Sequence, residues 1–150
     1  MTLPGELPLG LPATRSIARV KAYLNYRRSL WRGRSRVTDE YAAWFTALIK
    51  EDLPSATLVA QAVAALREEG PALGRPLVDR LKGSRIHHLK ELRPGSRGRS
   101  EIRIIFAFDP SRSALLLLGG DKAGNWQGWY REHIPVAERL YIEYTEQDEE

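Results

Sequence analysis

Residues 100–118 read SEIRIIFAFDPSRSALLLL, two runs of β-forming residues that a short DPSRS turn separates. In the first run, residues 100–108, apolar side chains at every second position predict a strand with one apolar face, and the other face carries Arg103. The second run, residues 114–118, is apolar throughout, which is typical of a strand covered on both sides. The connection is too short for a parallel crossover, so the two runs predict an antiparallel pair.

The segments before this pair extend the sheet. Residues 86–93 (IHHLKELR) predict a further strand, which a PGSRG turn joins to the next one. Residues 73–84 contain two glycines, a proline and no sustained period, so they predict an ordered connection. Residues 31–38 alternate in polarity and permit a short edge strand in front. We therefore expect a sheet of three or four strands.

Helical periodicity precedes and follows the strands. Residues 38–52 and 52–70 each repeat apolar side chains at i, i+3, i+4 and i+7, with Thr38 or Asp39 as a cap for the first helix, and they predict a helical hairpin. The segment on both sides of Pro135 keeps the same spacing, although this proline should kink the helix or split it in two. The sequence thus predicts an α+β fold in which the hairpin and a C-terminal helix pack on the apolar face of a small antiparallel sheet.

Composition excludes several classes of protein. A chain of 150 residues with 43% hydrophobic and 28% charged residues fits one folded domain, and no apolar run approaches the roughly 18 residues of a membrane span. The absence of cysteine excludes disulfides, thiolate zinc sites and a cysteine nucleophile. No Walker A loop, G-x-G-x-x-G, H-E-x-x-H or G-x-S-x-G occurs, so we expect neither a metal nor a small-molecule cofactor.

The net charge of +4 is unevenly distributed. Residues 1–36 carry eight basic side chains and one acidic one, residues 75–103 carry nine and three, and residues 146–150 form an acidic tail. We divide the chain into a basic N-terminal extension (1–36), partly disordered with a candidate helix at 14–31, a folded domain (37–145) and the tail. The basic helix suits a membrane surface, nucleic acid or packing on the domain, or it is upstream sequence with little role.

The second basic block follows the predicted strands. Lys90 and Arg93 lie on the strand before that of Arg103, so all three can share one patch, and Arg97 and Arg99 lie at the hairpin tip. A solvated polar face would produce the same pattern. The clustering nevertheless favours a surface that binds phosphates.

A further cation follows the last strand, in the glycine-rich loop GGDKAG. Lys122 in this loop precedes a helix that begins with Trp126, Trp129 and Tyr130. Basic side chains beside exposed aromatic rings suit single-stranded RNA, because charge binds phosphates and rings stack on bases. The alternative is that the rings pack in the core, which we expect for at least Trp126 or Trp129.

Four pieces of the chain, GRPLVDRLKGS, LKELRPG, RIIFAFDP and GGDKAGNWQGWY, occur in this order between residues 74 and 130. Together they resemble the RelE/HigB superfamily of type II toxins, in particular its phage-derived HigB-like branch. The resemblance extends from about Val37 to about Tyr144. It implies a RelE-like fold of the microbial-ribonuclease type and a cytoplasmic toxin that cleaves mRNA, typically on the ribosome, without a metal. A helix-turn-helix antitoxin would neutralise it. Such toxins usually begin at the first strand, so the 36 residues in front depart from the family's pattern, and a start codon assigned too far upstream would account for them.

The resemblance also carries over site residues by position. The catalytic candidates are Lys90, Arg93, Arg103, Lys122 and Tyr130, and the RNA-binding candidates are Arg85, Arg97, Arg99 and Trp126. In branches that use a histidine, His133 is a further candidate.

These residues suggest a mechanism in which the 2′-hydroxyl of RNA is the nucleophile. Arg93 and Arg103 would bind the phosphate, and Lys90 or Lys122 would act as base because neighbouring cations lower the pKa of a lysine. Tyr130 would act as base or stack on a nucleobase. Two alternatives stay open, namely a gyrase-inhibiting toxin on the same fold and a non-catalytic module that binds RNA or the ribosome.

Overall fold

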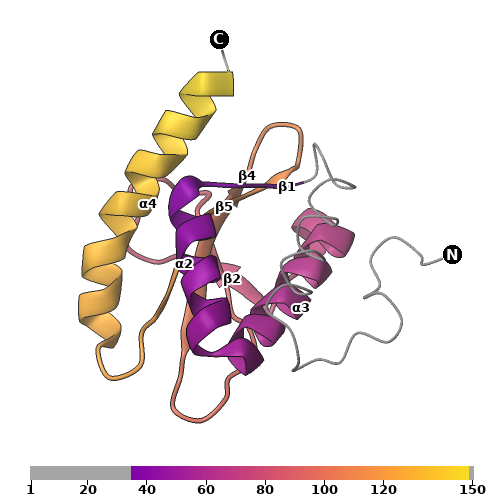
Figure 1. The fold of residues 1–150 in the computed structure, drawn as a ribbon. Coiled ribbons are helices and arrows are strands. Elements are labelled where there is room, and N and C mark those ends of the chain that lie inside the picture. Colours follow the sequence, from indigo (N-terminus) through magenta and orange to yellow (C-terminus); the bar gives the residue numbers. More distant parts are fainter. Residues whose placement is uncertain (1–34, 149–150) are drawn as a thin grey trace, which may run out of the picture.

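A five-stranded sheet organises residues 35–148, the part of the chain that this computed structural model describes (Figure 1). In chain order the elements are β1 (Ser35–Val37), α2 (Asp39–Glu51), α3 (Leu53–Glu69), the 3-10 turn η1 (Gly70–Ala72), β2 (Val78–Arg80), β3 (Lys90–Leu92), β4 (Ile102–Phe108), β5 (Ala114–Asp121) and α4 (Trp126–Asp148). The strand order is β1-β5-β4-β3-β2. The predicted α+β fold with a helical hairpin and a C-terminal helix is confirmed. The predicted helix at 14–31 lies outside the described residues.

The sheet differs from the prediction in size and direction. It has five strands, and β1 pairs in parallel with β5, whereas the other neighbours are antiparallel. The α2–α3 hairpin carries the chain away from β1, so no tight turn joins β1 to its neighbour β5. The two strands can therefore run in the same direction. The expected connection at 73–84 contains β2, which pairs with β3. A three-residue strand is too short to show a period in the sequence.

Helices cover both faces of the sheet, which corrects the expectation that one apolar face takes all of them. The helices α2 and α3 pack on the face that carries Ile104 and Phe106. The helix α4 packs on the opposite face, against Ile105 and Leu115. Arg103 lies on this second face by alternation along β4. Any site around Arg103 is therefore bounded by α4.

Local capping explains where the first two helices begin. The side chain of Thr38 accepts a hydrogen bond from the backbone N–H of Tyr41 at 3.0 Å, which caps α2. Asp52 ends α2 and also caps α3, because its carboxylate accepts from the N–H of Ser55 at 3.2 Å. These contacts confirm the predicted boundary between the two helices.

Pro135 lies within α4, which is one continuous helix from Trp126 to Asp148. Of the two expected effects of the proline, a kink or a split, the split does not occur. Proline removes one helical hydrogen bond, to the carbonyl four residues earlier, at Arg131. Both residues are exposed, so water can satisfy that carbonyl.

Two consecutive glycines of β5 receive tryptophan rings from opposite sides. A Cβ on Gly119 would lie 2.5 Å from the ring of Trp44, and a Cβ on Gly120 would lie 2.5 Å from Nε1 of Trp129. Each ring therefore lies directly on the backbone of β5. In this way Gly120 brings the first turns of α4 close to the sheet.

The substitution Gly120→Ala should destabilise the fold by about 1–3 kcal/mol, because the new methyl group pushes Trp129 away from β5. Urea unfolding measures the change. Gly74→Ala is the control, since nothing lies within 4 Å of its Cβ position, and it should change the stability by less than about 0.5 kcal/mol. Equal unfolding midpoints for the two variants would contradict the packing of Trp129 on Gly120.

Candidate active site

A basic groove lies between α4 and the segment that connects β2 to β3. Its volume is about 880 Å³. Its fifteen lining residues include six arginines or lysines and only two glutamates, so the groove favours anions. They are Arg80, Leu81, Lys82, Gly83, Arg85, Glu91, Arg93, Lys122, Trp126, Gln127, Tyr130, Arg131, Ile134, Pro135 and Glu138.

Glu91, the central residue of β3, is a buried carboxylate with hydrogen bonds to both oxygens. Its Oε1 accepts from Nε and Nη2 of Arg93 at 2.9 and 2.7 Å, and its Oε2 accepts from the hydroxyl of Tyr130 at 2.7 Å. Arg93 also lies 3.3 Å from the carboxylate of Asp79. Glu91 thus holds a guanidinium and a phenol in fixed positions at the groove.

Lys122 is almost completely buried, with 3% of its surface exposed. Its Nζ lies 3.4 Å from the centre of the Trp126 ring and 4.0 Å from Oε2 of Glu101. Burial lowers the pKa of Lys122, the Arg103 cation lowers it further, and the opposing effects of Glu91 and Glu101 are smaller. Lys122 therefore loses its proton more readily than an ordinary lysine. The sequence predicted this direction from neighbouring cations, whereas burial is the larger cause.

Arg103 lies beside the groove and is not one of its lining residues. It pairs across the sheet with Gly120, and its Nη1 donates to the carbonyl of Ile102 at 2.8 Å. Its Nε is buried and has no hydrogen-bond partner within residues 35–148. Its charge lowers the pKa of both Lys122 and Tyr130, although other effects outweigh it at Tyr130. Arg103 therefore acts on Lys122 and Tyr130 mainly through its charge.

Tyr130 is kept protonated by its surroundings. Burial raises its pKa to about 12, with the hydrogen bond to Glu91 and the charge of Glu91 acting in the same direction. A phenol of this kind is a poor base at neutral pH but a stable hydrogen-bond donor.

Glu91→Gln should lower the pKa of Tyr130 from about 12 towards the ordinary 10.0, because it removes the charge that disfavours the phenolate. The near-ultraviolet absorbance of phenolate, followed against pH, measures this shift, and the difference from Tyr130→Phe isolates the signal of Tyr130. Glu101→Gln is the matched control and should leave the titration unchanged. An unchanged titration in Glu91→Gln would show that Glu91 does not influence the phenol.

Lys90 lies away from the groove. It pairs with Phe106 of β4, a core residue beneath α2 and α3, so it projects from the sheet face opposite to Glu91. The predicted patch of Lys90, Arg93 and Arg103 is therefore wrong for Lys90. Residues three apart on a strand point to opposite faces, and this parity separates Lys90 from Arg93.

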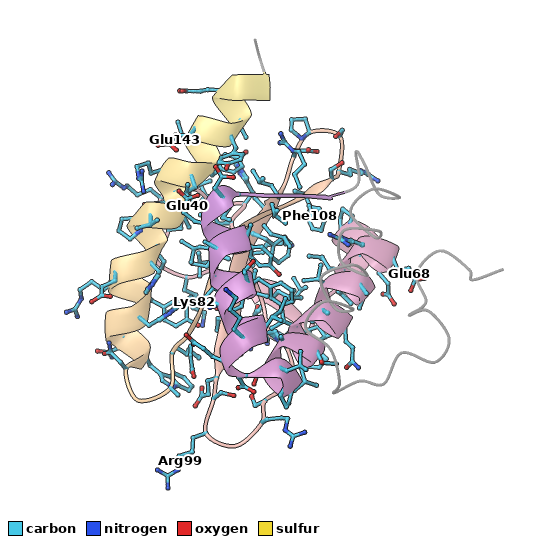
Figure 2. The ribbon with its side chains drawn as sticks, in the orientation of Figure 1. Glu40, Glu68, Lys82, Arg99, Phe108 and Glu143 are labelled. Carbon is cyan, nitrogen blue, oxygen red and sulfur yellow. The ribbon has the colours of Figure 1, made fainter. Side chains whose placement is uncertain are left out.

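The predicted RNA-binding arginines fall in two places. Arg85 lines the groove, and its backbone N–H donates to Glu138 at 2.7 Å. Arg97 and Arg99 lie in the loop between β3 and β4 and do not line the groove. Figure 2 shows Arg99 at the tip of this loop, pointing away from the rest of the molecule. Of these three arginines, only Arg85 therefore lines the groove.

The two tryptophans of α4 have different environments. Trp129 is 5% exposed and stacks on His133, with 4.6 Å between ring centres. Nδ1 of His133 also donates a hydrogen bond to the carbonyl of Trp129 at 2.7 Å. His133 does not line the groove. Trp126 is 54% exposed and lines the groove. The expectation that at least one of them packs in the core is confirmed by Trp129.

Sequence reasoning missed several lining residues. Glu91 was overlooked as an acid among basic residues, although it is two residues from Arg93 and must share its face. Gln127 and Arg131 are four residues apart, as are Trp126 and Tyr130, so helical spacing would have placed them on a strip of α4 that adjoins the strip of the two rings.

Two general features complete the description of residues 35–148. No group of three histidine, aspartate or glutamate side chains is arranged there to hold a metal ion. None of the helices in this part of the chain is long and apolar enough to cross a membrane.

Comparison with known proteins reveals a family. Residues 45–142 match the family described as phage derived protein Gp49-like (DUF891). Over 112 residues the chain is 50% identical to "Putative toxin HigB2" of Mycobacterium tuberculosis (strain ATCC 25618 / H37Rv). The aligned residues make up 75% of this chain and 54% of that protein. Over 96 residues it is 52% identical to "Putative toxin HigB3" of the same strain, and the aligned residues make up 64% of this chain and 79% of that protein. The chain thus spans about half the length of the first relative and most of the second. It belongs to the phage-derived Gp49-like family, the HigB-like branch of the RelE/HigB superfamily that its sequence resembles.

Proposed function

We propose that this chain is the toxin of a toxin–antitoxin system and that it is a metal-independent endoribonuclease acting on mRNA. The observation that carries the proposal is Lys122, a buried amine with a lowered pKa in a groove rich in cations. RNA suits such a groove, because its phosphates bind cations and its 2′-hydroxyl needs a base. The names of the two HigB relatives support the assignment as a toxin.

In the proposed reaction, the 2′-hydroxyl oxygen attacks the adjacent phosphorus while the bond from phosphorus to the 5′ oxygen of the next nucleotide breaks. The products are a 2′,3′-cyclic phosphate and a free 5′-hydroxyl. One proton leaves the 2′ oxygen and one is delivered to the 5′ oxygen, so no further reactant is required. The protein must align the attacking oxygen, accept and supply the protons, and stabilise the charge on the phosphate.

Each function has a candidate in the groove. Lys122 takes the proton of the 2′-hydroxyl, since Lys90 lies on the opposite face of the sheet. Arg93, held by Glu91 and Asp79, binds the phosphate through the N–H groups that these two carboxylates leave free. Arg103 acts through its charge, which lowers the pKa of Lys122 and adds to the attraction for the phosphate. Tyr130 is the candidate donor of the proton to the 5′ oxygen, a role in which its hydroxyl turns from Glu91 to the RNA.

The remaining parts of the proposal concern partners. Arg97 and Arg99 extend the basic surface beyond the groove and would contact RNA outside the cleavage site, on mRNA bound to the ribosome. We take residues 37–145 as the toxin domain, with a helix-turn-helix antitoxin as its cognate partner and the cytoplasm as its place of action.

Induction of the full chain in bacterial cells, followed by primer extension on abundant mRNAs, tests the proposal. We expect defined breaks and arrest of growth, both suppressed when the helix-turn-helix gene next to this one is co-expressed. If the purified protein cuts a short RNA, EDTA should leave the rate unchanged. Intact mRNA with stalled gyrase complexes would instead identify a gyrase inhibitor. Intact mRNA without such complexes would identify a non-catalytic binding module.

A further inference from the structure

Trp126 presents an open aromatic surface at one end of the groove. Its side chain is 54% exposed although tryptophan is largely apolar. One face of the ring is occupied, because the ammonium of Lys122 lies 3.4 Å from its centre. The exposure therefore belongs to the other face and the edges, which are free to stack on a flat ligand.

Two polar side chains without partners in the described part of the chain line the same groove as this ring. Gln127 and Arg131 are four residues apart on α4, which makes them neighbours on the helix surface, and both line the groove. Neither side chain makes a hydrogen bond or an ion pair with another residue in the described range 35–148. Arg93, in contrast, is bound by Glu91 and Asp79. A free amide and a free guanidinium thus line the same groove as an open aromatic face.

We propose that Trp126, Gln127 and Arg131 form a recognition site for one purine base of the bound RNA, with guanine preferred. This proposal rests on the proposed function, because it names the base that the same groove selects. A guanidinium pairs with O6 and N7 of guanine, and a carboxamide pairs with N6 and N7 of adenine, so both side chains recognise purine edges. Guanine has the advantage because hydrogen bonds from a cation are stronger. A pyrimidine has no N7 and offers less surface for stacking.

The position of the recognised base follows from Lys122. This residue contacts the ring of Trp126 and is also the proposed base for the 2′-hydroxyl. The purine on Trp126 therefore belongs to a nucleotide that flanks the cleaved phosphate. Cleavage sites should show a purine, most often guanine, at one fixed position beside the break.

Mapping of cleavage sites across cellular mRNAs tests this inference. Arg131→Gln should shift the ratio of guanine to adenine at the fixed position about tenfold towards adenine, because the amide pairs with adenine. Trp126→Leu should remove the purine preference. Arg139→Gln is the matched control, since it makes the same change on the same helix outside the groove, and it should keep the wild-type distribution. Identical base distributions in all four proteins would overturn the inference.

A binding measurement separates this inference from the proposed function. Titration with 5′-GMP should quench tryptophan fluorescence more than 5′-CMP does, and Trp126→Leu should remove the difference. Selective quenching without any mRNA cleavage would support the base site and overturn the ribonuclease proposal. Cleavage with equal quenching by both nucleotides and an unchanged base distribution would support the ribonuclease and overturn the base site.

Discussion

Replacing Lys122 with methionine should lower the rate of RNA cleavage about 10²- to 10⁴-fold while the protein stays folded. Methionine fills a similar volume but cannot accept a proton. The exchange also removes a cation that burial disfavours, so the free energy of unfolding should change by less than about 1.5 kcal/mol. Single-turnover cleavage and urea unfolding measure the two quantities. Lys50→Met, at an exposed position near the end of α2, is the control and should keep the wild-type rate.

The pH dependence of cleavage distinguishes a base from a cation at position 122. A base acts as the neutral amine, and the pKa of Lys122 lies below the ordinary 10.5. The wild-type rate should therefore rise with pH and level off at that lowered pKa. Lys122→Arg keeps the charge but does not lose its proton, so it should be as inactive as the methionine variant. An arginine variant with the wild-type rate would show that Lys122 only binds phosphate.

Helices were the most predictable part of the fold, because local rules determine them. The cap at Thr38, the double role of Asp52 and the apolar spacing of α2 and α3 all involve residues a few positions apart. The strand β2 escaped prediction because its three residues are extended only through pairing with β3. The position of α4 on the second face of the sheet also depends on distant contacts, chiefly Trp129 on Gly120.

The site was predictable in composition and less so in geometry. Lys122, Arg93, Tyr130 and Trp126 were identified from residue type and position, and the structure places all four in the groove. Lys90 was included because it shares a predicted strand with Arg93 across a hairpin from Arg103, although strand parity places it on the other face. Proximity along a strand therefore says little about a shared site unless the residues are an even number apart.

Arg103 illustrates how a predicted residue can keep its importance and change its role. The sequence suggested a guanidinium that grips the phosphate directly. In the structure Arg103 lies beside the groove, with Nη1 on the carbonyl of Ile102 and Nε buried. Its charge is the second largest influence that lowers the pKa of Lys122, after burial. A substitution of Arg103 should therefore change the cleavage rate through the protonation of Lys122.

Arg103→Met should reduce cleavage at neutral pH by about ten- to a hundredfold and move the pH profile upwards. Without the neighbouring cation the pKa of Lys122 rises towards 10.5, so a smaller fraction of the amine is neutral at a given pH. Part of the lost rate should return at higher pH, where more of Lys122 is neutral. Arg139→Met, on the exposed side of α4, is the control and should leave both rate and profile unchanged. A rate that falls equally at all pH values, with the profile in place, would instead show that Arg103 acts on the phosphate and not through Lys122.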